Sequence, residues 1–172
     1  MPGLGAWARR RGEVLDDPGA DGATVVASLV DVARSNRLFG GTRAALAALE
    51  RFLETGAAPA TLTLLDVGTG LGDIPAAAAA RAAARGLSLR CVGVDRHPAA
   101  ARAAHRSGLA TVVAEATRLP FRDGAVDLAM ASQLLHHFEG RAAERLLREF
   151  DRVAGRGAVI ADLRRSVVAA GG

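Results

Sequence analysis

The chain has 172 residues, which is enough for one domain with a two-sided core, and half of them are hydrophobic, which excludes a wholly disordered chain. All 22 residues of the lysine-plus-arginine class are arginine, and the formal net charge is only +4, so charge alone does not indicate a nucleic-acid partner. The sequence pI of about 11.0 nevertheless keeps an RNA partner as an alternative.

The cysteine count and the hydropathy pattern exclude further classes. Cys91 is the single cysteine, so an internal disulfide and a cysteine-rich metal site are excluded, and its apolar surroundings predict a core position. No apolar run approaches the length of a membrane span, and the N-terminal arginines precede no secretory signal. We therefore expect a soluble cytoplasmic protein without a metal site.

The first part of the chain predicts helices. Residues 1–22 have weak periodicity, with at most a short helical piece, and we interpret them as a lead-in. Amphipathic patterns predict one helix over residues 23–36 and another over 42–54, with Gly40 and Gly41 between them. We separate this N-terminal helical region, residues 1–57, from an α/β domain over residues 58–172.

A strand, a tight turn and a helix follow in direct succession. The apolar run Leu62–Leu65 ends at Asp66, and an alanine-rich pattern over residues 74–85 predicts a helix. Glycines occupy alternate positions between the two, where a turn this tight needs residues without Cβ. This order predicts a nucleotide-binding crossover. The three glycines are Gly68, Gly70 and Gly72.

The spacing of the glycines argues against a dinucleotide. The dinucleotide fingerprint G-x-G-x-x-G would have its third glycine where Asp73 stands. Carboxylates at Asp66 and Asp73 flank the loop and would repel a pyrophosphate. They suit a nucleoside that carries positive charge and no phosphate.

A second carboxylate follows the next strand. Residues 89–95 form an apolar run that ends at Asp95, about 27 residues beyond Gly68, the separation at which nucleotide sites hold an acidic group beside the ribose. Asp95 is therefore predicted to accept the ribose hydroxyl protons. An aspartate at this position can also simply cap the following helix.

The remaining elements continue the alternation of strands and helices. This alternation predicts an α/β fold, a Rossmann-like open parallel sheet flanked by helices. The expected elements are a helix over 98–106, strands over 109–114 and 126–131, a helix over 141–153 and a strand over 158–161 that ends at Asp162.

Three features in this order carry a resemblance to a known family. Residues 66–72 read D-V-G-T-G-L-G, Asp95 ends the second strand, and residues 115–121 read E-A-T-R-L-P-F. Together they resemble class I S-adenosylmethionine-dependent methyltransferases, in particular the small-molecule group of quinone biosynthesis. Glu115 replaces the aspartate that lies near the adenine amino group in that family, and the longer side chain changes the geometry of this contact. Alternatively, residues 115–121 are a surface turn.

The resemblance covers residues 61–162 and implies S-adenosylmethionine as the cofactor. It assigns cofactor contacts to the glycine-rich loop, to the ends of the strands and to the segment that begins at Glu115. These residues are Asp66, Gly68, Thr69, Gly70, Gly72, Asp95, Arg96, Glu115, Ala116, Ala131 and Ser132.

The resemblance also bears on the acceptor. N-terminal helices cap the cofactor in this family, so residues 36–41 are either a hinge with substrate contacts or an ordinary turn. Residues 131–134 read A-S-Q-L and lack the [D/N]-P-P-[Y/F] segment of nucleic-acid amino methyltransferases, which favours a small organic acceptor methylated on oxygen or carbon. His136 and His137 are either general-base candidates or structural, one packed under the sheet and one bonded to backbone.

Alternatives to this function remain. One is a non-catalytic domain of the same fold that acts through protein contacts, and a less favoured one is an RNA methyltransferase. Complete family members continue past the fifth strand into a helix and an antiparallel pair, whereas this sequence ends at Gly172. We therefore expect a fragment or a natural truncation, with an exposed sheet edge that favours homo-oligomers.

Overall fold

The computed structural model describes residues 15, 17, 19–54 and 60–162. The expectations for the lead-in before Leu15, for the end of the second helix near Gly56 and for the C-terminal residues 163–172 lie outside this part of the chain. Two helices precede an alternating series of strands and helices, as expected. The elements are α2 (Gly22–Leu38), α3 (Gly41–Glu54), β1 (Thr61–Val67), α4 (Asp73–Ala83), β2 (Ser88–Asp95), α5 (Pro98–Arg106), β3 (Ala110–Val113), β4 (Val126–Ser132), the 3₁₀ helix η1 (Leu135–His137), α6 (Arg141–Val153) and β5 (Ala154–Ala161).

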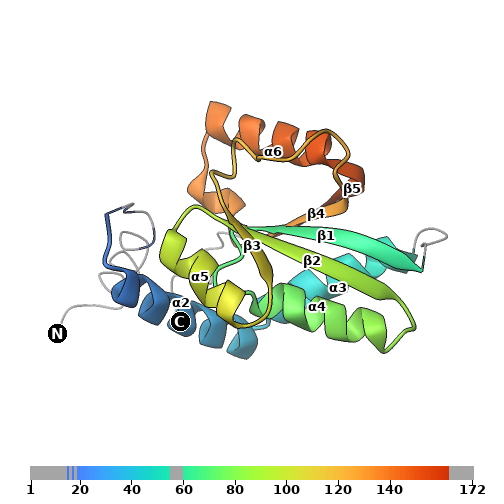
Figure 1. Ribbon diagram of the computed structural model, residues 1–172, viewed down its shortest axis with the longest axis horizontal. Coiled ribbons are helices and arrows are strands. Elements are labelled where there is room, and N and C mark those ends of the chain that lie inside the picture. The colour runs from blue at the N-terminus through green and yellow to red at the C-terminus, as the bar shows by residue number, and fades with distance from the viewer. Residues whose placement is uncertain (1–14, 16, 18, 55–59, 163–172) are drawn as a thin grey trace.

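The strands form one parallel sheet in the order β3-β2-β1-β4-β5 (Figure 1). Leu64 in the central strand β1 pairs with Cys91 of β2 on one side and with Leu128 of β4 on the other. The chain passes from β1 to β2 in one direction and returns to β4 on the opposite side, which makes the β1/β4 boundary a topological switch point. Open parallel sheets bind ligands outside the carboxyl ends of the strands at this place. The predicted fold class is confirmed.

Helices cover both faces of the sheet (Figure 1). Side chains alternate along β1, so Leu64 packs with α3 and α4 on one face while Leu65 packs with α6 on the other. Phe150 of α6 is 1% exposed and fills the centre of the second layer. Two apolar layers therefore hold the sheet, and the carboxyl ends of its strands remain available for a site.

Several strand limits differ from the sequence prediction by one residue, and the start of β5 differs by more. β1 continues past Asp66 to Val67, because Val67 still pairs with both neighbouring strands and is fully buried. β5 begins at Ala154, directly after α6, rather than near residue 158. The sequence did not indicate this start, because the glycines at positions 155 and 157 weaken the strand pattern. A register shift between Val126 and Leu128 accommodates the longer strand.

Helix α2 lies against α5 and α3 at the carboxyl-end edge of the sheet (Figure 1). Asp21 caps its N-terminus by accepting hydrogen bonds from the backbone amides of Ala23 and Thr24. In the described part of the chain, no helix combines the length and the hydropathy needed to cross a membrane.

We expect Phe150→Ala to lower the free energy of unfolding by about 3–5 kcal/mol, because it empties a packed core position. Leu147→Ala on the same helix is the matched control, since Leu147 is 45% exposed, and a surface substitution changes stability by about 0.5 kcal/mol. Urea unfolding of the two variants measures the difference. Equal losses in both would contradict the packing of α6 described above.

Candidate functional site

A cavity of about 400 Å³ lies at the carboxyl ends of the strands. Its floor is the loop after β1 with the ends of β2 and β4, and its opposite wall is α2. A cavity of this size falls within the range of about 300–1,000 Å³ that small-molecule sites occupy. It coincides with the switch point of the sheet, so topology and cavity indicate the same site.

The glycine-rich loop needs its glycines for two reasons. Gly68 and Gly70 have φ angles of +74° and +54°, which L residues with a Cβ rarely adopt. A Cβ on Gly68 would also lie 2.9 Å from the Leu134 side chain, and one on Gly70 would lie 3.3 Å from Leu29 of α2. The loop is thus pressed between the end of β4 and the N-terminal helix.

The backbone amides of this loop are already bonded within the protein. The N–H groups of Gly68 and Thr69 both donate to the carbonyl of Val94, at 2.8 and 2.9 Å. The next amide, of Gly70, donates to Oδ2 of Asp95 at 3.0 Å. Loops that bind a pyrophosphate direct such amides at the ligand, so the arrangement found here does not offer a phosphate cradle.

Asp95 lines the cavity and also orders the chain on both sides of it. Its Oδ1 accepts from the amide of His97 at 2.9 Å, while Oδ2 holds Gly70. Each carboxylate oxygen has a further lone pair available for a ligand hydroxyl. Burial raises the pKa of Asp95, and the two amide hydrogen bonds oppose this rise.

Asp66 does not line the cavity, although the sequence assigned it a direct contact. It is 3% exposed, and its Oδ2 accepts from the Thr69 hydroxyl at 2.8 Å. Burial, followed by the nearby charges of Asp73 and Asp95, raises its pKa to about 7. Its carboxyl group therefore supports the loop from behind, and the flanking charge expected from sequence comes from Asp73, which does line the cavity.

The other predicted residues fall into two groups. Gly72 and Ala131, like Asp66, are not among the residues that line the cavity, and their predicted cofactor contacts stay predictions. The predicted residues that line the cavity are Gly68, Thr69, Gly70, Asp95, Arg96, Glu115, Ala116, Ser132, His136 and His137.

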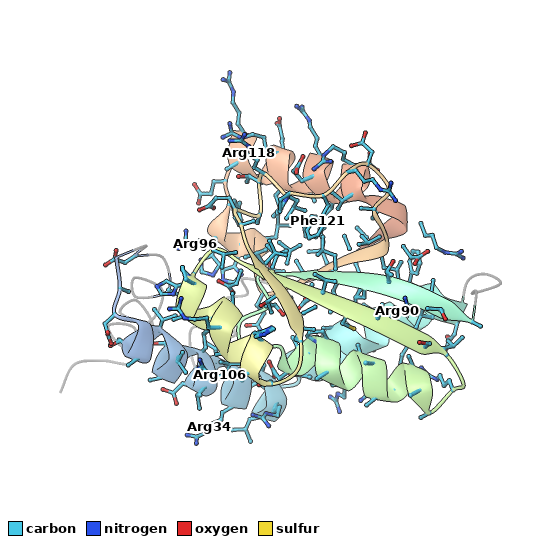
Figure 2. The ribbon with its side chains drawn as sticks, viewed as in Figure 1. Arg34, Arg90, Arg96, Arg106, Arg118 and Phe121 are labelled. Carbon is cyan, nitrogen blue, oxygen red and sulfur yellow. The ribbon has the colours of Figure 1, made fainter. Side chains whose placement is uncertain are left out.

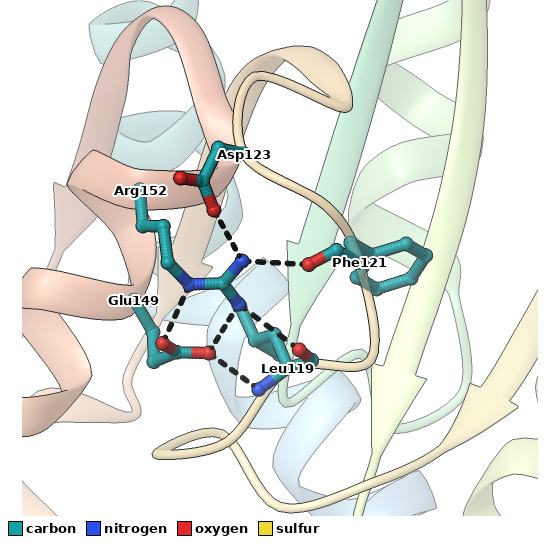
Figure 3. Close-up of polar contacts among 5 residues, drawn as sticks. All are labelled: Leu119, Phe121, Asp123, Glu149 and Arg152. Carbon is teal, nitrogen blue, oxygen red and sulfur yellow. Dashed lines mark hydrogen bonds and ion pairs between the residues drawn. The ribbon is translucent and has the colours of Figure 1, made fainter.

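The segment that begins at Glu115 is fastened to α6 by an ion-pair cluster (Figure 3). Arg152 donates to the carbonyls of Leu119 and Phe121 at 3.0 and 2.7 Å. Glu149 accepts from Arg152 and also from the amide of Leu119, at 2.6 Å. These bonds fix the path of the L-P-F segment, which follows the cavity-lining residues Glu115 and Ala116.

Helix α2, which belongs to the N-terminal region expected to cap the cofactor, supplies an apolar wall whose residues the sequence did not identify. The amphipathic pattern predicted the helix, but it gave no partner for its apolar face. That face contains the residues Val25, Leu29, Val32 and Ala33, all of which line the cavity.

An amide pair joins this wall to the end of β4. The Asn36 side chain accepts a hydrogen bond from the amide group of Gln133, and both residues line the cavity. Gln133 has a φ of +54°, and among the described residues it is the one non-glycine with positive φ. A Cβ on Gly41 would lie 2.5 Å from the Gln133 amide nitrogen, so glycine there makes room for the pair. Asn36 thus belongs to α2 and the site, while the turn itself lies at residues 39–40.

The two histidines lie in η1, at the cavity and not under the sheet. His136 bonds through Nδ1 to Oδ1 of Asp162 at 2.7 Å, and its backbone amide donates to Oδ2 at 2.9 Å. The alternative in which one of them packs under the sheet is therefore wrong. Ser132 lines the same cavity, and its buried hydroxyl has no hydrogen-bond partner in the part of the chain that the structure describes.

Comparison with known proteins connects this geometry to a family. The model of a methyltransferase domain matches residues 65–161, which is more than half of the chain. The chain belongs to this family. Among proteins with curated descriptions, none matches the sequence.

Solved structures share the fold. A protein of Methanococcus maripaludis, provisionally described as an S-adenosyl-L-methionine-dependent methyltransferase, has 17% identity and a TM-score of 0.60 over 78% of this chain and 62% of its own. A provisionally described methyltransferase from an antibiotic biosynthesis pathway of Anabaena variabilis has 20% identity and a TM-score of 0.54 over 67% and 43%. A structure from work on conversion of a disulfide bond into a thioacetal group in echinomycin biosynthesis has 25% identity and a TM-score of 0.53 over 67% and 47%. The chain spans about half the length of these proteins.

Family membership implies S-adenosylmethionine as the cofactor, and the residues present fit it. The glycine loop lets a ligand approach the backbone closely, and the buried Ser132 hydroxyl has no hydrogen-bond partner among the described residues. Asp73, Asp95 and Glu115 all line the cavity and suit a ligand with cationic groups. Among the described residues, no group of three or more His, Cys, Asp or Glu side chains is placed to hold a metal ion.

Because the pKa of Asp66 is raised, we can predict how the stability of the methyltransferase domain depends on pH. A carboxyl group whose pKa is near 3.8 in the unfolded chain and about 7 in the folded chain stabilises the fold fully below the lower value. This contribution is lost as the pH rises through about 7. We expect the free energy of unfolding of the wild type, measured relative to Asp66→Asn, to fall between about pH 4 and about pH 8.

The asparagine side chain of this variant can still accept the Thr69 hydrogen bond and cannot titrate, which makes the variant a matched reference. Urea unfolding of both proteins across this range measures the difference, and other titrating groups cancel in it. A difference that does not change with pH would show that Asp66 titrates normally.

Proposed function

We propose that this chain transfers a methyl group from S-adenosylmethionine to an oxygen or carbon atom of a small organic acceptor. The observation that carries the proposal is the cavity in which the family's glycine-rich loop faces an apolar helix wall. One end of the cavity has polar groups for the cofactor, and the other has the apolar side chains that an organic acceptor needs. Bound S-adenosylmethionine would supply an activated methyl group on a sulfonium centre.

Each part of the cavity floor has a proposed role in holding the cofactor. The remaining lone pairs of Asp95 would accept the ribose hydroxyl protons. Glu115 and the backbone of Ala116, held in place by the Arg152 cluster, would face the adenine ring. Ser132 would donate its unpartnered hydroxyl to the ligand.

The acceptor wall favours a small apolar molecule over a nucleic acid. Val25, Leu29 and Val32 present aliphatic surface to the cavity, whereas RNA recognition relies on basic and aromatic side chains. Arg34, Arg90 and Arg118 lie at different edges of the molecule (Figure 2), so these arginines do not form one basic face. A methyl transfer in such a cavity depends mainly on positioning and on exclusion of water.

The first experiment is calorimetry of the chain with S-adenosylmethionine, S-adenosylhomocysteine and NAD. We expect binding of the first two and none of NAD, because the loop amides are not available for a pyrophosphate. A methyl-transfer screen with radiolabelled S-adenosylmethionine and a panel of small phenols, enols and quinols then tests the activity. Cofactor binding with no transfer to any acceptor would favour the non-catalytic alternative, and binding of NAD would contradict the proposal.

Asp95→Asn tests the floor of the site. Asparagine has one acceptor oxygen in place of two, so either the Gly70 amide or the His97 amide loses its partner. We expect the affinity for S-adenosylmethionine to fall about 10-fold or more. The control is Asp151→Asn on the exposed side of α6, and calorimetry that finds equal affinities in both variants would exclude the role given to Asp95.

A further inference from the structure

A histidine and an aspartate form a pair at the edge of the cavity. Asp162 follows β5, and His136 lies in η1 just beyond β4, so the neighbouring strand ends bring them together. The Nδ1–Oδ1 distance is 2.7 Å, and the backbone amide of His136 donates to the other oxygen, Oδ2, at 2.9 Å. The carboxylate therefore fixes both the backbone and the ring of His136.

This arrangement sets the tautomer of the neutral ring. A carboxylate accepts the proton of Nδ1–H, which leaves the lone pair on Nε2. Among the described residues, none forms a hydrogen bond with Nε2 of His136. The side chain of His136 is 32% exposed and lines the same cavity as Gly68 and Ser132. An accessible basic nitrogen thus lies in the cavity where the acceptor is proposed to bind.

We propose that His136 is the general base of the methyl transfer, that Asp162 positions it, and that the acceptor carries a hydroxyl group such as that of a phenol or an enol. This inference rests on the function proposed above and narrows its substrate class. A base is needed only where the acceptor atom must lose a proton, so the pair favours a hydroxyl over an already nucleophilic carbon.

The step balances without a further reactant. The acceptor hydroxyl gives its proton to Nε2 of His136, and a lone pair of its oxygen forms the bond to the methyl carbon. The carbon–sulfur bond breaks, and its electron pair remains on sulfur, so nothing is oxidised or reduced. The carboxylate of Asp162 stabilises the imidazolium until water removes the proton.

Other charged groups share the cavity with this ring. His137 stacks beside it with ring centroids 4.1 Å apart and a tilt of 36°. The titratable and charged residues that line the cavity around the pair are Asp73, Asp95, Arg96, His97, Glu115 and His137.

The kinetic test uses His136→Gln and Asp162→Asn, with His105→Gln and Asp151→Asn as exposed controls outside the cavity. The acceptors, all at about pH 8, are phenol and catechol, which stay mostly protonated there, and 4-nitrophenol, which is largely ionised. For phenol and catechol we expect His136→Gln to lower kcat about 100-fold or more, with unchanged cofactor affinity by calorimetry. For 4-nitrophenol the loss should be much smaller. With phenol and catechol, kcat should fall less in Asp162→Asn than in His136→Gln, and it should not change in the two controls.

The pH profile and the ring tautomer separate this role from a structural one. We expect the wild-type rate with phenol to rise with pH as the base loses its proton, and this rise to vanish in His136→Gln. Nitrogen-15 NMR of the free protein should show the neutral His136 ring protonated on Nδ1, and a mixture of tautomers in Asp162→Asn. This readout does not depend on activity.

Several results would overturn the assignment. These are equal rate losses for all three acceptors, an unchanged pH profile in His136→Gln, a wild-type proton on Nε2, and a cofactor-binding wild type that methylates none of the three. A wild type that does not bind S-adenosylmethionine would instead overturn the proposed function, and the base assignment with it. Calorimetry of the wild type distinguishes the two failures.

Discussion

The carboxylate of Asp95 holds the site together. One oxygen binds the amide of Gly70 in the loop after β1, and the other binds the amide of His97 at the start of α5. A single side chain at the end of β2 therefore fixes two backbone segments that approach it from different directions. Because backbone amides that are buried must have partners, loss of this carboxylate would leave both segments without their anchor.

This anchoring decides which ligands the loop can accept. The amides of Gly68 and Thr69 face the carbonyl of Val94, so three successive donors are used by the protein itself. A phosphate would have to break these bonds, whereas a ligand that offers hydroxyl and cationic groups can use the remaining carboxylate lone pairs. The expected preference for a ligand without phosphate thus follows mainly from the direction of these three amide hydrogen bonds. Asp66 contributes less, because it lies behind the loop and burial raises its pKa.

The sequence predicted those features of the fold and the site that depend on a few neighbouring residues. The alternation of strands and helices, the glycine loop, Asp95 and the E-A-x-x-L-P-F segment are each legible over a few residues. From these features, Gly68, Gly70, Asp95, Glu115 and Ala116 line the cavity. The pairs Asn36–Gln133 and His136–Asp162 join residues 97 and 26 positions apart, so no local pattern indicates them. The positive φ of Gln133 was equally hidden, because glutamine carries no preference for that conformation. The start of β5 was missed because its glycines weaken the strand signal.

Helix α2 has a consequence for how such a protein can diversify. It precedes residues 65–161, the region shared with the methyltransferase-domain family, yet it forms the wall opposite the glycine loop. It contacts the loop through Leu29, which would lie only 3.3 Å from a Cβ on Gly70. Substitutions on the aliphatic face of α2 can therefore reshape one half of the chamber while the strand tips stay untouched. With the acceptor bound against this wall as proposed, part of the acceptor preference depends on residues outside the shared region, and these residues can change while the glycine loop is retained.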